Sequence, residues 1–360
     1  MNQSIVKFRS ITLVIWMAFF ALQTPQLSHA WQVSTGFTDP CHEGFATEVY
    51  ADFLSNIPPA GLPVPDGEVW DKLSRDLVQE EDLPAPTPQH RFALFSLIVG
   101  VRYPDTDGHS ILNLSTTRSA HIEQDNQYAH CLRRADDDGE TGDIAAVLGT
   151  KDYIRYLIEL ANASRMKPIE DQVVATKMYL DFYGRFDVMV WEPLFYLGQA
   201  MHAVHDSFSH TIRTQDLRQI VHVMNYVEAV TGDHDQRRDG MAHSNAMDAC
   251  SGEMMPLANA AIEASIDFVV AVRDELGGLD SGATDRVLDK WMTYQPGCNI
   301  DNDYCNSAWV EIAKTDQTQP MIEEYLGCQC GIPNSLNSKA YFFLLVLFLV
   351  LISFIRRNYM

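Results

Sequence analysis

The chain has 360 residues, of which 46% are hydrophobic and 21% charged, the composition of an ordinary globular protein. This length corresponds to one or two domains, and the composition excludes a collagen, a coiled coil or a largely disordered chain. Lysine and arginine total 26 against 48 aspartate and glutamate residues, giving a net charge of −22. Because so acidic a surface repels a phosphate polyanion, no nucleic-acid partner is expected.

Residues 1–30 have the pattern of a secretory signal peptide. Lys7 and Arg9 precede an apolar run, ITLVIWMAFFAL at 11–22, that is too short for an ordinary membrane span. Ser28 and Ala30 supply small residues at the −3 and −1 positions of a cleavage site. Cleavage there would export the protein and leave Trp31 as its first residue, whereas an uncleaved anchor is the alternative interpretation.

Residues 31–325 are predicted to form one all-α, multi-helix domain. Apolar residues recur with helical spacing and strand-like alternation is scarce. Proline-rich stretches at 58–65 and 84–88, and the acidic stretch 135–143, are predicted connectors. The predicted helices span residues 42–56, 68–80, 89–100, 121–134, 151–163, 168–186, 188–208, 216–230, 254–276 and 283–292.

The sequence MHAVHDSFSH at 201–210 is the most informative motif. His202, Asp206 and His210 follow i, i+4, i+8 spacing, which places them on one stripe of a helix, about 6 Å apart per step. His202 and His210 are then about 12 Å apart, too far to share one ion, while Asp206 can serve a metal on either side. The preceding residues are apolar, so the stripe is predicted to be buried, where metal ligation relieves uncompensated charge. Core histidines satisfied by hydrogen bonds are the alternative.

Seven cysteines follow the predicted signal peptide, in a compartment that permits disulfides. Cys298 and Cys305 flank a short polar loop and form the predicted pair. The odd total leaves one thiol over, assigned to the tail that holds Cys328 and Cys330. The loop NIDNDY between Cys298 and Cys305 lacks the full spacing of a calcium loop, which favours a simple stapled loop.

The last part of the chain is predicted to reach a membrane. Residues 326–339 contain the short motif GCQCG and are interpreted as a stalk or sorting motif. Residues 340–357 form a predicted transmembrane segment that ends in Arg356 and Arg357, a basic pair expected to stay cytoplasmic. The protein is therefore expected at the cell surface or in the periplasm. Removal of the segment by a processing protease, with release of the body, remains an alternative to a plain tail anchor.

The stretch LGQAMHAVHDSFSHT at 197–211 closely resembles the signature helix of the zinc-dependent phospholipase C superfamily. That superfamily includes secreted bacterial phosphatidylcholine-hydrolysing enzymes and single-strand-specific zinc nucleases. The chain looks most like the branch of phospholipases C found in Pseudomonas and Legionella, with related motifs in Het-C-type proteins. The resemblance covers roughly residues 31–250 and implies an all-α fold with a cluster of two to three Zn²⁺. One zinc ligand in that family is the terminal amine and carbonyl of an N-terminal tryptophan.

Matched to this family, five residues take positions of metal ligands. His202 and Asp206 match its His-x-x-x-Asp pair, in which the aspartate bridges two zinc ions. Trp31 matches the terminal tryptophan and His42 the first-helix histidine. His210 matches the histidine that follows, although the gap after Asp206 is shorter than in the best-known branch.

The third zinc site is matched less fully. His243 looks like the next ligand, but the position four residues later, where the family has an acid, is Met247. Asp248 is the closest substitute. Four histidines that have no family counterpart are assigned surface or supporting roles, namely His109, His205, His222 and His234.

The family's fourth element is an aspartate followed by a histidine about 14 residues later. Asp107 and His121 have that separation, Asp105 competes with Asp107, and His130, in QYAHCLRR, competes with His121. These alternatives stay open. The aspartate of this element, Asp107 or Asp105, is implied as the general base beside the metal-bound water.

The resemblance implies a phospholipase C that hydrolyses phosphatidylcholine-like glycerophospholipids to diacylglycerol and a phosphorylated head group. Neither a GxSxG elbow nor a GxxxxGK[ST] loop occurs in the sequence, so serine-hydrolase and P-loop chemistry are not supported. A zinc nuclease or other phosphodiesterase of the same fold is one alternative. A non-catalytic, Het-C-like exported binding protein is the other, and Met247 is its best support.

Overall fold

Four long helices, α4 (Pro88–Thr106), α6 (Gly139–Arg165), α7 (Glu192–Ser209) and α10 (Met255–Leu276), make up the centre of the fold. The computed structural model describes residues 41–54, 56–78, 83, 87–109, 122–180 and 184–320. The predicted signal peptide, stalk and C-terminal transmembrane segment lie outside these residues, as do Trp31, His121, Cys328 and Cys330.

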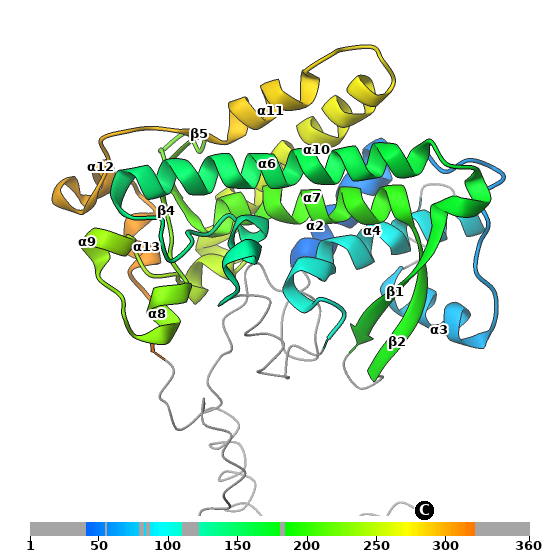
Figure 1. Cartoon of the computed structure of the whole chain (residues 1–360), viewed down its shortest axis with the longest axis horizontal. Coiled ribbons are helices and arrows are strands. Elements are labelled where there is room, and N and C mark those ends of the chain that lie inside the picture. The colour runs from blue at the N-terminus through cyan, green and yellow to red at the C-terminus, as the bar shows by residue number, and fades with distance from the viewer. Residues whose placement is uncertain are drawn as a thin grey trace, which may run out of the picture. The chain divides into compact units, whose positions relative to one another are not determined.

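Helix α7 is the central element, packed against α4, α6 and α10 (Figure 1). Two glycines allow the backbones of α4 and α7 to touch. A Cβ added at Gly198 would lie 2.5 Å from the carbonyl oxygen of Leu97, and one at Gly100 would lie 2.3 Å from that of Phe195. Because real Cβ atoms do not approach so closely, the contact requires glycine on both helices. It also brings the end of α4 alongside the histidine motif of α7.

The ends of α4 are determined by the local sequence. Thr87 accepts a hydrogen bond from the backbone N–H of His90, and Pro88 takes the first helical turn, where its missing N–H costs nothing. The side chains of 92–99, together with Val101, are buried. The helix ends at Asp107, whose left-handed backbone (φ 43°) cannot continue it. Asp105 therefore lies in the last turn, and its side chain is buried.

Shorter elements surround this centre. The described chain begins with α2 (Cys41–Val49), which continues as a π-helical turn over Tyr50–Leu54. The 3₁₀ helices at Gln124–His130 and Asn245–Asp248 each end on a histidine or aspartate of the predicted site. The remaining short α-helices are α3 (Glu68–Leu77), α8 (Val227–Thr231), α9 (Gln236–Asp239), α11 (Ala283–Trp291), α12 (Asp303–Asn306) and α13 (Val310–Ala313).

The fold is mostly helical, but the prediction of an all-α domain is wrong in two places. The predicted helix 168–186 is instead a 3₁₀ turn, Ile169–Gln172, followed by strand β1 (Val173–Leu180). Strand β1 pairs antiparallel with β2 (Gly184–Trp191), in register from Val173 opposite Trp191 to Leu180 opposite Gly184. Both strands are rich in valine, methionine and aromatic residues, and β-branched and aromatic side chains favour a pleated, half-buried surface.

The second correction concerns the predicted helix 216–230. Its first half is β4 (Gln219–Val223), whose sequence QIVHV is also rich in β-branched residues. Strand β4 lies between β3 (Thr211–Arg213) and β5 (Thr293–Tyr294), antiparallel to the first and parallel to the second. The predicted helix 121–134 is reduced to the 3₁₀ helix Gln124–His130. In contrast, α10 and α11 lie within one residue of the predicted ranges 254–276 and 283–292.

Two disulfides close the described domain. Cys298 and Cys305 are bonded, which confirms the predicted pair. The other disulfide joins Cys41, at the start of α2, to Cys250 across a sequence separation of 209 residues. Cys131 is a free, buried thiol, and burial raises its pKa to about 12, so it is inert at neutral pH. The free thiol among the described residues is therefore in the core, while the prediction of a leftover thiol in the tail falls on Cys328 and Cys330, outside the described residues.

Among the described residues, one helix, Gly252–Leu276, is long and apolar enough to cross a membrane by length and composition. It contains α10, which packs against α7, α2 and α11. Half of its apolar window is buried inside the protein. This packing is that of a core helix.

Candidate metal centre

Buried histidine and aspartate side chains from five parts of the chain meet beside α7. Each is no more than 1% exposed. Helix α2 supplies His42, the last turn of α4 supplies Asp105, and the 3₁₀ helix before α6 supplies His130. Helix α7 and its C-cap supply His202, Asp206 and His210, and segment 243–248 supplies His243 and Asp248.

His202 is held in one orientation by the α4–α7 contact. Its Nδ1–H donates to the carbonyl oxygen of Val101, 2.7 Å away. Because the carbonyl only accepts, the neutral ring of His202 has its lone pair on Nε2, which faces the carboxylates. A ligating histidine is commonly oriented in this way by a hydrogen bond from its other nitrogen.

His130, His202 and Asp206 converge at the spacing of metal ligands. The Oδ2 atom of Asp206 lies 2.9 Å from Nε2 of His202 and 3.1 Å from Nδ1 of His130, and the two nitrogens are 3.1 Å apart. With zinc bonds of about 2.0–2.1 Å, the ligand atoms of a tetrahedral site are about 3.3 Å apart. The three atoms therefore fit three corners of such a site.

His42 and Asp105 extend this group on the side of α2 and α4. The Nε2 atom of His42 lies 3.3 Å from Oδ1 of Asp206, so the two oxygens of Asp206 face different histidines. Asp105 Oδ1 lies 3.7 Å from His202 Nε2 and 3.7 Å from His130 Nδ1. His42, Asp105 and His202 thus form a second group of three, which shares His202 with the first. Asp206 has the arrangement of a bridging carboxylate.

A separate group forms at the other end of the histidine stripe. The Oδ1 atom of Asp248 lies 3.3 Å from His243 Nε2 and 3.6 Å from His210 Nε2. His210 donates from Nδ1 to the carbonyl oxygen of His130 at 2.5 Å, which leaves Nε2 as its lone pair. Within the described residues, His210 Nε2 and both oxygens of Asp248 make no hydrogen bond, although they are buried. Such groups are costly unless a cation occupies the space between them.

The electrostatics of the centre also favour a bound cation. Burial raises the pKa of Asp248 to about 7, with His210 only partly opposing it. Burial disfavours the charged form of His202, but Asp206 and Asp105 overcome this and raise its pKa to about 9. Asp206 is buried too, yet His202 and His210 hold its pKa well below the usual range. Among the described residues the ion-pair partners of Asp206 and Asp248 are imidazoles alone, which a divalent cation would supplement.

His205 has a supporting role that the helical stripe did not reveal. Its Nδ1 lies 3.0 Å from Nδ1 of His42, and the two rings are stacked with centroids 5.2 Å apart. For His42 to present Nε2 as a lone pair toward Asp206, its Nδ1 must carry the proton and donate to His205. Burial, reinforced by His42 and His202, lowers the pKa of His205 well below 6.5, so it is neutral and able to accept. The local signal was the second histidine in HAVHD.

The structure brings one candidate of each open pair into the centre. Asp105 lies in the centre, whereas Asp107 is exposed at the C-terminal end of α4 and does not belong to any of the three groups. His130 lies in the centre, and its competitor His121 is outside the described residues. Met247, where the family has an acid, is buried apolar core, and the turn Asn245–Asp248 brings Asp248 to the site instead.

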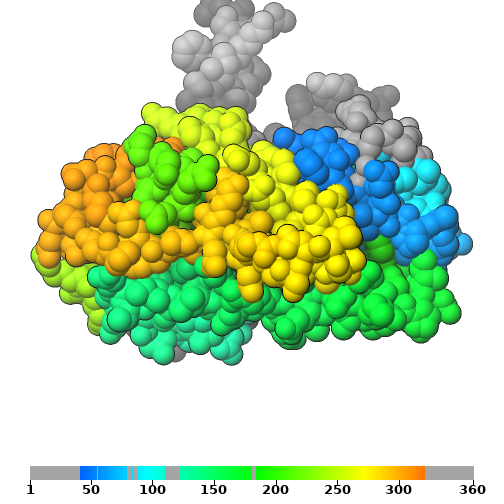
Figure 2. Space-filling model, turned by 90° about the horizontal axis from the view of Figure 1, so that it is seen from above, coloured from blue at the N-terminus to red at the C-terminus, as the bar shows by residue number. Residues whose placement is uncertain are grey.

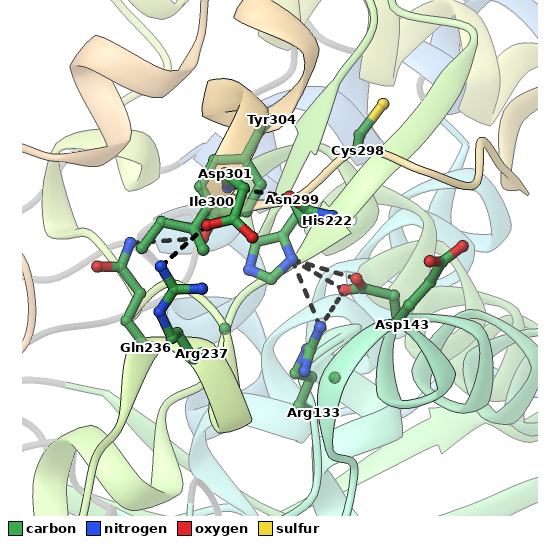
Figure 3. A pocket seen from close by; sticks show the side chains of 13 residues that line it. Arg133, Asp143, His222, Gln236, Arg237, Cys298, Asn299, Ile300, Asp301 and Tyr304 are labelled. Carbon is green, nitrogen blue, oxygen red and sulfur yellow. Dashed lines mark hydrogen bonds and ion pairs between the residues drawn. The ribbon is translucent and has the colours of Figure 1, made fainter.

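A second buried cluster contains His222 but has no metal-like geometry (Figure 3). Arg133 Nη2 lies 2.6 Å from Oδ1 of Asp143, and His222 Nδ1 lies 3.1 Å from the same oxygen. The other nitrogen of His222 accepts from the backbone N–H of Met241 at 2.8 Å. Arg133 also donates to the carbonyl oxygens of Val223 and Asp137. The guanidinium balances the carboxylate, so this cluster beside a pocket of about 200 Å³ is structural.

Comparison with known proteins identifies no relative. No protein-family model, no curated protein and no solved structure matches the chain.

Proposed function

We propose that this protein is a zinc-dependent phosphodiester hydrolase of the phospholipase C superfamily, acting on phosphatidylcholine-like glycerophospholipids. The observation that carries the proposal is the convergence of five buried histidines and three buried aspartates around the motif of α7. Together with the resemblance of residues 197–211 to the family's signature helix, this convergence supports a centre of two to three zinc ions.

The donor set suits zinc better than calcium or magnesium. Imidazole nitrogens outnumber carboxylates at the centre, and hard cations prefer sites made of oxygen alone. His130, His202 and Asp206 would hold one ion, His42 and Asp105 would extend this site to a second, and the third would lie among His210, His243 and Asp248. The hydrogen bonds from His202 to Val101 and from His210 to His130 orient both rings for ligation.

When bound, zinc would supply a Lewis acid for the phosphodiester and lower the pKa of a bound water toward about 7. The chain's own residues position that chemistry. Asp206 turns its two oxygens toward different histidines and so fixes their relative position. Asp105, at the edge of the centre, would accept the proton of the attacking water as general base. The products would be diacylglycerol and a phosphorylated head group.

The proposal includes export. The Cys41–Cys250 and Cys298–Cys305 bonds support an oxidising compartment, because disulfides are rare in the reducing cytosol. The signal-like residues 1–30 and the apolar segment 340–357 would direct the protein out of the cytosol and anchor it to the membrane. Processing of the C-terminal segment by a protease would release the body.

The decisive experiment is zinc analysis combined with a phosphocholine-release assay on protein that begins at Trp31. We expect two to three zinc ions per chain, loss of activity on EDTA treatment and recovery on addition of Zn²⁺. The melting temperature should fall in EDTA, because a metal bound only by the native state stabilises it.

The outcomes distinguish the alternatives. Release of nucleotides from single-stranded nucleic acid, without phosphocholine release, would replace the phospholipase by a nuclease of the same metal centre. Zinc binding without either activity would indicate a non-catalytic binding protein. A chain without bound zinc, whose melting does not respond to EDTA, would contradict the metal centre itself.

A further inference from the structure

An apolar cavity of about 650 Å³ lies beside the first half of α7, away from the metal ligands in its second half. Its walls come from α6, α7, α10 and the start of the described chain. In Figure 2 the yellow segment that contains α10 borders the blue start of the described chain. The wall side chains include Trp191, Leu194, Leu197, Val269, Val272 and Leu276. This volume lies within the range of about 300–1,000 Å³ typical of small-molecule sites.

The charges around this cavity have one sign. Among the described residues that line it, Arg165, Lys167 and Arg273 are the ionisable ones, and no carboxylate lines it. Lys167 pairs with Glu192, and Arg273 pairs with Asp274, which leaves the positive charge of Arg165 in excess. In a chain with 48 acidic and 26 basic residues, three cations around one apolar cavity depart strongly from the average surface.

Two unusually exposed apolar side chains lie close in sequence to residues that line the cavity. Met166, between Arg165 and Lys167, is 73% exposed, and Leu279, close to Gly277 in the cavity wall, is 79% exposed. They are the two most exposed large hydrophobic residues of the described part of the chain. An apolar cavity with basic groups in its wall matches a molecule with an alkyl chain and an anionic head.

We propose that this cavity binds a long-chain fatty acid. The alkyl chain would lie against Leu194, Leu197 and Val272, where it is removed from water. The carboxylate would meet Arg165, whose Nη2 donates to the carbonyl oxygen of Leu276 and to Oδ1 of Asn162, and whose remaining N–H groups can donate to an anion. The proposal is independent of the metal centre and of the hydrolase activity.

The charge pattern favours this ligand over the chain's own apolar segments. Segment 11–22 is preceded by Lys7 and Arg9, and segment 340–355 is followed by Arg356 and Arg357. Either segment would bring further positive charge to a basic cavity wall, and like charges in close approach are unfavourable. A fatty acid instead supplies the missing anion.

The test is a titration of the full, delipidated chain with oleate and, separately, with oleyl alcohol. Trp191 lies in the cavity wall, so a brominated stearate should quench part of the tryptophan fluorescence. We expect saturable binding of one oleate per chain, at least tenfold tighter than binding of the uncharged alcohol. The same binding should persist in EDTA, which separates this site from the metal centre.

Charge reversal in the cavity wall tests the role of the cations. Arg165→Glu combined with Arg273→Glu should weaken oleate binding at least tenfold, and its circular dichroism shows whether it folds. The matched control, Arg218→Glu with Arg237→Glu, makes the same charge change at exposed positions that do not line the cavity. The proposal is overturned by non-saturable oleate binding, by equal affinity for the alcohol, or by equal weakening in the control. The oleate–alcohol comparison needs no variant and decides the matter if the cavity variant does not fold.

Discussion

Two clusters of buried histidine and aspartate lie in this protein, and they differ in how their charge is balanced. In the Arg133–Asp143–His222 cluster, a guanidinium lies 2.6 Å from the carboxylate, and both nitrogens of the imidazole have partners. In the centre on α7, the ion-pair partners of Asp206 among the described residues are imidazoles alone. A cluster that contains its own permanent cation is complete, whereas one that lacks it is suited to receive a metal.

The largest expected effect comes from removing the carboxylate of each cluster in turn. Asp206→Asn should reduce bound zinc by at least one ion per chain and reduce phosphocholine release to background, because the bridging anion is lost. Asp143→Asn should leave zinc content unchanged but destabilise the fold by about 3–5 kcal/mol, because it leaves Arg133 buried without its counter-charge. Zinc analysis and denaturant unfolding measure the two effects.

EDTA provides the internal control for this pair. The melting temperature of Asp143→Asn should still fall on chelation, while that of Asp206→Asn should respond much less. If Asp143→Asn loses zinc and Asp206→Asn keeps both zinc and activity, the two clusters have been assigned the wrong roles.

The next largest effect is on the pH dependence of the unfolding free energy of the metal-free protein. The centre on α7 is expected to lose stability as the pH rises, and the Arg133–Asp143–His222 cluster as the pH falls. Burial disfavours charge on His202, but Asp206 and Asp105 raise its pKa to about 9. This stabilisation is present below the unfolded pKa of about 6.5 and is lost as the pH rises through about 9. Burial lowers the pKa of His222, against the opposing effect of Asp143, so that cluster loses stability as the pH falls below about 6.5.

Unfolding free energies in EDTA, measured across this pH range, separate the two contributions. Asp206→Asn should flatten the alkaline decline, and His222→Gln should flatten the acidic one. With zinc bound the alkaline decline should disappear, because a ligating imidazole is already neutral. An alkaline decline of equal size with and without zinc would show that His202 is not a ligand.

The smallest expected effect concerns His205, which contacts a ligand without belonging to the three groups. His205→Phe removes the acceptor for Nδ1 of His42 and should weaken zinc binding about 10–100-fold, the usual cost of losing such a partner. His205→Gln retains an acceptor and should recover part of the affinity. Competition with a zinc chelator measures both, and His234→Gln, at a histidine near the surface bonded to the carbonyl oxygen of Gly240, is the matched control.

The sequence was most informative where periodicity and motif coincide. Helices α10 and α11 follow the predicted ranges closely, whereas α7 begins four residues later than the predicted helix 188–208, whose start lies in β2. The stripe of His202, Asp206 and His210 identified the helix around which the candidate ligands gather. The hairpin β1–β2 was missed because its residues also fit a helical period, and pairing with the next strand along the chain decided between the two. Local patterns therefore located the site, and tertiary contacts shaped its surroundings.

Other features of the centre depend on contacts that no local pattern encodes. Asp105 and Asp107 are two residues apart, and only the end of α4 at Asp107 determines which one is buried. His130 reaches the centre from a 3₁₀ helix in a segment predicted to be α-helical. The partners of the ligands, such as the carbonyl oxygen of Val101, are backbone atoms and leave no signature in the sequence.

The Cys41–Cys250 disulfide connects the metal centre to the order in which the protein matures. His42 follows one half-cystine directly, and Asp248 precedes the other by two residues, so one covalent bond closes the loop that contains every described ligand. A chain still being synthesised lacks His243 and Asp248, the candidate ligands furthest along the sequence. In a reduced chain, bringing residues 41 and 250 together costs the full loop-closure entropy, because no covalent bond holds them. If the centre binds metal as proposed, loading would thereby be coupled to completion of the chain and to an oxidising environment.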